Sequence, residues 1–181
     1  MTATEYVILV DNHNQEMGHA EKLVAHQKNL LHRAFSVFIF RNHPQQLLLQ
    51  QRAFDKYHSA GLWTNTCCSH PRPGESIIAA GERRLYEELG VKTPLNDLGW
   101  FHYNAYFENA LSENEIDHVL IGEIPSDVTI YPNPAEIHTY RWVTLEELQQ
   151  EISLYPHHFT PWLSQALEMV IKKSAVSVIE K

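Results

Sequence analysis

One long helical segment lies between two groups of strand-like segments in this chain, and that order restricts the fold. We expect the helix over Ser76–Leu89, because the breaker cluster Pro71–Gly74 precedes it and Gly90 supplies a C-terminal stop. Strands on either side of a central helix, followed by terminal helices, favour an α+β fold. We therefore predict an α/β/α sandwich in which helices flank a mixed sheet.

The strand-like segments are short runs rich in aromatic and β-branched residues, and turn-forming residues separate them. We expect strands at Glu5–Val10, Phe35–Phe40, Leu47–Gln51, Phe101–Phe107, His118–Ile124 and His138–Val143. Between them we expect turns at 11–14 and 42–44, a loop over 54–61, an acidic loop over Glu108–Asp117, and a short helical or extended lead-in over Ala20–Ala25.

Two further helices are predicted near the end of the chain from their first residues. Thr144 and Glu147 have the spacing of a capping box, and Thr160–Pro161 offers an N-cap followed by proline at the first helical position. The chain has 181 residues and shows no repeat, low-complexity tract or linker, so we expect one domain over 1–181.

Charge and hydropathy exclude some classes of partner. The formal net charge is -8, which argues against a nucleic-acid partner. We find no apolar run of membrane-spanning length and no signal-peptide pattern, so we expect a cytoplasmic protein without a membrane partner. A phosphate pocket in such an acidic chain has to gather lysine and arginine locally, which makes basic residues near the chemistry informative.

The segment Thr64–Pro71 (TNTCCSHP) concentrates reactive side chains. Its neighbouring cysteines, Cys67 and Cys68, are poorly placed to form a disulfide with each other, and two small buried hydrophobes explain the pair equally well. Three histidines and two glutamates along the chain would suffice for an octahedral Mn²⁺, Mg²⁺, Fe²⁺ or Zn²⁺ site: His26, His32, His70, Glu113 and Glu115. Each of these side chains alone is better explained as structural or solvated.

The helix and its flanks (GESIIAAGERRLYEELGV) resemble the signature of the Nudix superfamily. The matching residues are Glu75, Arg83, Leu85, Glu87, Glu88, Gly90 and Val91. Two positions depart from it: Ser69 replaces the first glycine, and Arg84 replaces a glutamate of the metal-binding cluster. Because Arg84 inverts the charge, pyrophosphate hydrolysis is disfavoured. Glu88 remains a ligand suited to Mg²⁺, and Arg84 becomes a candidate diphosphate contact.

The same helix, together with TNTCCSHP, Glu113-Asn114-Glu115 and FTPW at 159–162, resembles the type I isopentenyl-diphosphate isomerases. The likeness is ordered along the chain from Glu21–Lys22 to Trp162. It implies a Nudix-like fold and the interconversion of isopentenyl and dimethylallyl diphosphate in isoprenoid biosynthesis. By this resemblance Cys68 and Glu115 transfer the protons, with Glu115 as acid and Cys68 as thiolate base. Cys67 is structural. Tyr103 can hydrogen-bond to Glu115 and relay the proton, and an aromatic residue that only packs in a strand explains it equally well.

The resemblance also implies the binding residues. His26, His32, His70, Glu113 and Glu115 would hold one divalent metal, Mn²⁺, Mg²⁺ or Zn²⁺. Glu88 would hold a Mg²⁺ that also binds the substrate diphosphate, with the carbonyl of Cys68 nearby. Lys22, Arg52, Lys56 and Arg84 would contact the diphosphate, and Trp162 would place its π face over a carbocation. The expected partner is this small molecule, and the expected state is a monomer or homodimer.

Two other function classes remain open at this point. A Nudix pyrophosphohydrolase would release phosphate or a nucleoside monophosphate from nucleoside diphosphate derivatives. A non-enzymatic metal- or phosphate-binding module would bind metal without turning over either class of substrate. The arginine at position 84 argues against the first of these.

Overall fold

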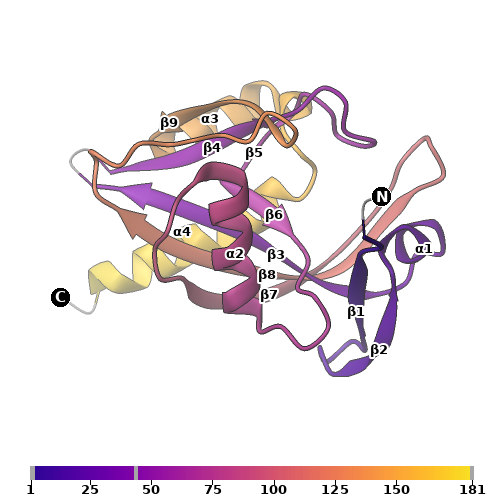
Figure 1. Ribbon diagram of the computed structural model, residues 1–181. Helices are drawn as coiled ribbons and strands as arrows, with labels where there is room; N and C mark the ends of the chain where they lie inside the picture. The colour runs from indigo at the N-terminus through magenta and orange to yellow at the C-terminus, as the bar shows by residue number, and fades with distance from the viewer. Residues whose placement is uncertain (1–2, 43–44, 180–181) are drawn as a thin grey trace.

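Nine strands form one mixed sheet in the computed structural model, which describes residues 3–42 and 45–179, with side chains to residue 175 (Figure 1). The strands are β1 (Tyr6–Val10), β2 (Glu16–Glu21), β3 (His32–Arg41), β4 (Gln46–Arg52), β5 (Trp63–Thr64), β6 (Cys67–Ser69), β7 (Asn96–Tyr106), β8 (Ser112–Ile124) and β9 (Ile137–Val143). The helices are α1 (Lys22–Gln27), α2 (Ile77–Leu89), α3 (Leu145–Leu154), a 3₁₀ turn at Pro156–His158, and α4 (Leu163–Ile179).

The centre of the sheet is the parallel pair β3 and β8. Their register runs from His32 opposite Glu115 to Arg41 opposite Ile124. The other pairings of β3, with β1, β4 and β6, are antiparallel. Seven consecutive residues of β3, from Ala34 to Phe40, are buried, as expected for a strand covered on both faces.

Alternate residues of β3 pack into two separate cores, which makes the molecule a three-layer sandwich. Phe35, Val37 and Ile39 pack with residues of α2. Phe38 and Phe40 pack with residues of α3 and α4. In Figure 1, α2 accordingly lies on one face of the sheet and α4 on the other. The predicted α/β/α sandwich with a mixed sheet is confirmed.

The central helix ends at the predicted residue and begins one residue later than predicted, at Ile77, with Ser76 as its N-cap. Ser76 accepts a hydrogen bond from the backbone N–H of Ala79 through its Oγ, at 3.1 Å, and Gly90 closes the helix with a φ of +68°. The capping box of Thr144 and Glu147 is also present at the start of α3.

The predicted start of the last helix is wrong by two residues. Thr160 precedes a turn at Pro161 and Trp162, and α4 begins at Leu163. The reason lies in the Thr160 side chain, whose Oγ1 lies 2.7 Å from Oγ1 of Thr64. A hydroxyl held in this buried pair ties the entry of α4 to the segment that precedes β6.

The predicted acidic loop at Glu108–Asp117 is also wrong over most of its length. β8 begins at Ser112, so Glu113, Glu115 and Asp117 belong to a strand that pairs with β7 from Tyr106 opposite Ser112 onward. β2 was not expected, and the lead-in at 20–25 spans its end and most of α1. Of the turn expected at 42–44, residues 43 and 44 lie outside the described residues.

None of the helices in the described part of the chain has the length and apolar character needed to cross a bilayer.

Candidate active site and metal centre

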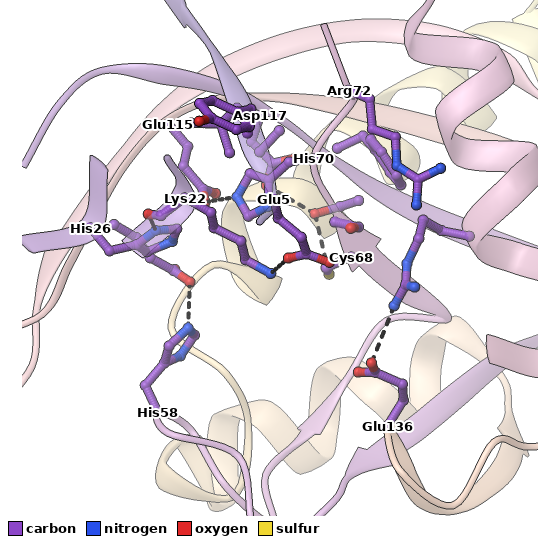
Figure 2. A pocket seen from close by; sticks show the side chains of 18 of the residues that line it. Glu5, Lys22, His26, His58, Cys68, His70, Arg72, Glu115, Asp117 and Glu136 are labelled. Carbon is purple, nitrogen blue, oxygen red and sulfur yellow. Dashed lines mark hydrogen bonds and ion pairs between the residues drawn. The ribbon is translucent and has the colours of Figure 1, made fainter. Parts of the chain in front are cut away.

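The candidate site is a pocket of about 730 Å³ lined by residues of β1, α1, β3, β6 and β8 (Figure 2). Figure 1 shows the β1–β2 hairpin and α1 at this end of the β3–β8 pair. Strand register brings the reactive residues to it. Glu115 lies opposite His32, and Cys68 lies opposite Ser36 on the other side of β3. Most of the predicted site residues line the pocket: Lys22, His26, Arg52, Lys56, Cys68, His70, Arg84, Glu113, Glu115 and Trp162. The remaining three, His32, Glu88 and Tyr103, are buried.

The alternation of side chains along β6 separates the two cysteines. Successive side chains of a strand point to opposite faces. Cys67 is fully buried in the core under α2, whereas Cys68 lines the pocket. This placement agrees with the structural part predicted for Cys67.

Four of the five predicted ligands of the divalent metal lie together. His26, His32, His70 and Glu115 each offer one ligand atom, and these atoms all lie within 4.8 Å of one another. The Nε2 atom of His70 lies 2.9 Å from Oε1 of Glu115. In Figure 2 His26 and His70 flank Glu115. Residues from α1, β3, β8 and the end of β6 thus converge on one small volume.

The histidine nitrogens in this group are arranged as metal ligands require. Nδ1 of His26 donates to the carbonyl of Lys22 at 2.6 Å, and Nδ1 of His32 donates to the carbonyl of Leu30 at 2.7 Å. Both Nε2 atoms are buried and make no hydrogen bond to the described residues, and Nε2 of His32 lies 3.4 Å from Oε1 of Glu115. A backbone acceptor on Nδ1 leaves Nε2 available as a ligand atom, which is the usual arrangement behind a metal-bound histidine. The residues present therefore fit a divalent cation.

Charge is unevenly distributed within the group. Burial alone would raise the pKa of Glu115, but its close contacts with His32 and His70 outweigh burial and hold that pKa well below its usual range. Burial lowers the pKa of His70 to about 3. At neutral pH the site therefore contains an ionised Glu115 beside a neutral His70, and these are the protonation states that bind cations.

Glu113 is the predicted ligand that lies outside this group. Its Oε1 is 3.0 Å from Nε2 of His58, and its Oε2 is buried without a hydrogen-bond partner in the described chain. Burial, and then the charge of Glu115, raise the pKa of Glu113. The ligand assignment of Glu113 stays a prediction, and its observed partner is a histidine that the sequence did not indicate.

Cys68 is held by two polar neighbours. Its Sγ donates to Oδ1 of Asn65 at 3.2 Å and lies 3.6 Å from Oγ of Ser36. Ser36 in turn donates to Oδ2 of Asp117 at 2.9 Å. Burial, reinforced by the negative charge of Asp117, raises the pKa of Cys68 to about 12. The sulfur is therefore a thiol at neutral pH.

The two aromatic residues predicted for the site lie next to each other. The ring centroids of Tyr103 and Trp162 are 6.2 Å apart, and Nε1 of Trp162 donates to Oδ1 of Asn65 at 3.3 Å. Tyr103 lies opposite Glu115 in the β7–β8 register. The predicted hydrogen bond between them is not present, because the Tyr103 hydroxyl is buried with no partner in the described residues.

The predicted diphosphate contacts are basic side chains that each have a partner in the pocket. Lys22 Nζ donates to Oε2 of Glu5 at 2.9 Å, and Lys56 pairs with Glu136. Arg52 places its guanidinium 5.6 Å from the centre of the Trp162 ring. A diphosphate entering the pocket would compete with the two carboxylates for the lysine ammonium groups.

The predicted Mg²⁺ ligand Glu88 is buried between two donors. Nη2 of Arg84 donates to Oε1 of Glu88 at 2.7 Å, and Nε2 of Gln50 donates to Oε2 at 3.1 Å. Arg84 also pairs with Glu87 at 2.7 Å. The arginine therefore occupies the position between carboxylates that a cation would otherwise take in an acidic cluster.

Several residues in or beside the pocket were not identified from sequence: Glu5, Ser36, His58, Asn65, Arg72, Asp117 and Glu136. Asp117 could have been found by extending the alternation of Glu113 and Glu115, had the strand been recognised. His58 and Glu136 lie in loops whose local sequence carries no such pattern.

Comparison with known proteins agrees with this architecture. The NUDIX domain family matches residues 30–163. A Deinococcus radiodurans crystal structure (DR0079) superposes with a TM-score of 0.71 at 20% identity, covering 91% of this chain and 98% of that one. A MutT protein from Methanosarcina mazei Go1 gives a TM-score of 0.64 at 18% identity, over 80% of this chain and 95% of that one. These structural likenesses concern the fold.

Curated relatives are much closer in sequence. An isopentenyl-diphosphate Delta-isomerase from Photobacterium profundum is 45% identical over 177 residues, which cover 96% of this chain and 98% of that protein. An isopentenyl-diphosphate Delta-isomerase 2 from Photorhabdus laumondii is 47% identical over 163 residues, 90% of each chain. The family match over residues 30–163 and these relatives together establish that the chain belongs to the NUDIX superfamily and, within it, to the isopentenyl-diphosphate Delta-isomerases.

Proposed function

We propose that this chain interconverts isopentenyl diphosphate and dimethylallyl diphosphate. The observation that carries the proposal is the placement of Cys68 and Glu115 in one pocket with a cluster of basic side chains. A thiol that holds a proton and a carboxylate that lacks one form a matched donor and acceptor. The names of the 45% and 47% identical relatives support the same reaction.

The reaction moves one double bond by adding one proton and removing another. Adding a proton to the terminal methylene carbon of isopentenyl diphosphate forms a C–H bond and leaves a tertiary carbocation. Removing a proton from the carbon on the other side breaks a C–H bond, and its electron pair forms the new double bond. One acid and one base are therefore needed, and each must be regenerated for the next turnover.

The pKa directions assign the starting positions of the protons. Burial raises the pKa of Cys68 to about 12, so the thiol carries the proton that can be donated. The pKa of Glu115 is lowered, so its carboxylate is the acceptor. The sequence-based assignment started from Glu115 as acid and Cys68 as base. Because the reaction is reversible, each group of the pair acts as acid in one direction and as base in the other, and Cys68 is the group that holds a proton at rest.

The aromatic side chain in the pocket suits a carbocation. Trp162 lines the pocket and is 4% exposed, with the buried Tyr103 packed beside it. The π face of Trp162 would stabilise positive charge, and excluding water would prevent capture of the cation as an alcohol. The diphosphate does not react. Its contacts with Lys22, Arg52 and Lys56 would position the alkene.

His26, His32, His70 and Glu115 would hold one divalent cation, with Glu113 as a further ligand. Mn²⁺, Mg²⁺ and Zn²⁺ all fit this mixture of nitrogen and oxygen donors. When bound, the cation would supply positive charge that fixes Glu115 and tunes its acidity. Glu88 would take part in a Mg²⁺ site with the substrate diphosphate, which requires Arg84 or Gln50 to release one of its oxygens.

Deuterium incorporation tests the proposal directly. Incubating the protein with isopentenyl diphosphate and Mg²⁺ in D₂O should yield dimethylallyl diphosphate with deuterium in a methyl group. Cys68→Ala and Glu115→Gln should each abolish formation of this product. Absence of isomerisation by the wild-type protein, or full activity of Cys68→Ala, would contradict the proposal. Release of phosphate from nucleoside diphosphate derivatives would instead indicate a Nudix hydrolase.

A further inference from the structure

His58 is enclosed at the edge of the pocket although it lies in a loop. The residue lies between β4 and β5 and is 9% exposed. Its ring stacks on Phe107 with the centroids 4.7 Å apart and an interplanar angle of 12°. The ring of Trp162 approaches from the edge, with centroids 6.3 Å apart. These contacts fix the plane of the imidazole.

The fixed imidazole is directed at a carboxylate beside the metal group. Nε2 of His58 lies 3.0 Å from Oε1 of Glu113. Figure 2 shows the His58 ring pointing toward the region of His26, with this contact as a dashed line. Glu113 and Glu115 are two residues apart on β8 and therefore share a face of the strand. His58 thus holds one oxygen of Glu113, while the second oxygen is buried and unpaired among the described residues.

This loop and the end of β4 that leads into it carry groups predicted to contact the diphosphate. Nη2 of Arg52 donates to the carbonyl of His58 at 3.3 Å, and Lys56 lies two residues before it. A second contact joins the loop to the β7–β8 hairpin, because Nδ2 of Asn109 donates to the carbonyl of Tyr57 at 2.7 Å. The loop proposed to bind the charged end of the substrate is therefore pinned to the hairpin that supplies the carboxylates.

We propose that His58 is a positioning residue that acts through Glu113: it sets the orientation of this carboxylate toward the metal group and couples the metal site to the diphosphate-binding loop. The coupling to the diphosphate rests on the proposed isomerase function, whereas the effect on metal binding does not. A histidine that is not itself a metal ligand then influences how tightly the site binds its metal.

Calorimetric titration of the metal-free protein with Mn²⁺ tests the first half of the proposal. Loss of a partner that orients a ligand typically costs about 10- to 100-fold in metal affinity, and we expect a loss in this range for His58→Ala. His58→Gln should recover most of the affinity, because its amide can donate to Glu113 from a similar position. The exposed His13 in the β1–β2 turn provides the matched control, and His13→Ala should bind Mn²⁺ as the wild type does.

A double-mutant cycle shows whether His58 acts through Glu113. In a Glu113→Ala background, His58→Ala should change the Mn²⁺ affinity by no more than about twofold, because the contact is already lost. Wild-type affinity in His58→Ala, or an undiminished loss in the Glu113→Ala background, would overturn the proposal. Thermal unfolding shows whether each variant is folded. If His58→Ala is not folded, the Mn²⁺ affinities of His58→Gln and the wild type are compared instead.

The coupling to the diphosphate is tested by steady-state kinetics at saturating Mn²⁺. We expect His58→Ala to raise KM for isopentenyl diphosphate by more than it lowers kcat, since the loop with Lys56 loses a contact with the hairpin. An unchanged KM would overturn the coupling to the diphosphate. A wild-type protein without isomerase activity would refute the proposed function, while the Mn²⁺ titrations would still decide the effect of His58 on the metal site.

Discussion

Asn65 is the residue whose replacement should reveal most about how the site is held together. It is fully buried, and its Oδ1 accepts hydrogen bonds from Thr64, Cys68 and Trp162 at 2.9, 3.2 and 3.3 Å. Its Nδ2 donates to the carbonyls of Val37 and Cys67 at 3.1 and 2.9 Å. Because both carbonyls take a donor from Nδ2, the amide has a single favourable orientation, which presents the oxygen to Cys68.

The expected cost of Asn65→Ala follows from the groups it leaves without partners. Val37 and Cys67 lose the side-chain donor to their carbonyls, and Trp162 loses the acceptor for its indole N–H, all in the interior. A buried polar group left unpaired costs about 1–3 kcal/mol. Discounting for water entering the space that the amide vacates, we expect a loss of about 3–5 kcal/mol in the free energy of unfolding. A domain of this size has only about 5–15 kcal/mol in total.

Urea unfolding followed by circular dichroism measures this loss as a lower midpoint at unchanged slope. Asn104→Ala is the control, because Asn104 is exposed on β7, and it should shift the free energy of unfolding by less than about 0.5 kcal/mol. An Asn65→Ala protein that loses less than about 1 kcal/mol would show that the amide network is dispensable and that the reasoning from unpaired groups is wrong.

Three further results are expected. Arg84→Gln should raise KM for isopentenyl diphosphate by about 10-fold or more, since a charge-assisted contact contributes about 1.5–3 kcal/mol, and steady-state kinetics would contradict this by showing an unchanged KM. Saturating Mn²⁺ at about 100 times its Kd should stabilise the wild type by about 2.7 kcal/mol, visible as a higher Tm that is absent in His32→Gln. Arg83 lowers the pKa of Glu75 through a hydrogen bond, so this carboxylate stabilises the fold above its unfolded pKa, near 4.5, and the contribution is lost as the pH falls through the lower folded value. The urea midpoints of wild type and Glu75→Gln should accordingly differ at pH 7 and converge in acid, and a difference that persists through acid would contradict the assignment.

The fold could be predicted where local sequence carries the structural signal. The aromatic and β-branched run of β3 predicts a buried strand, and Ser76, Gly90 and the Thr144 capping box set helix ends through local hydrogen bonds. β2 could not be predicted in this way, since EMGHAE is a largely exposed, polar strand at the edge of the sheet. Pairing with β1, rather than its own composition, makes it a strand.

The metal group is harder to predict because its members meet only through tertiary structure. His32 and Glu115 become neighbours because β3 and β8 pair in parallel, and His26 joins them because Ser112 donates to its carbonyl at 2.8 Å and ties α1 to β8. The spacing of the histidines and glutamates along the sequence reveals neither the pairing of β3 with β8 nor this hydrogen bond. The resemblance to a known family supplied the convergence that the spacing alone left open.

The failed prediction at 108–117 follows from the chemistry of the site. Glu113, Glu115 and Asp117 alternate along β8 with the period of a strand, but the buried face carries carboxylates where a strand normally buries apolar side chains. Burying three like charges on one face is unfavourable unless each finds its own compensation. Here two histidines lower the pKa of Glu115, His58 contacts Glu113, and burial raises the pKa of Asp117 well above its usual value beside Ser36. The pattern that looks like a solvated loop is therefore a strand whose inward carboxylates are each compensated within the pocket, and only the structure shows those partners.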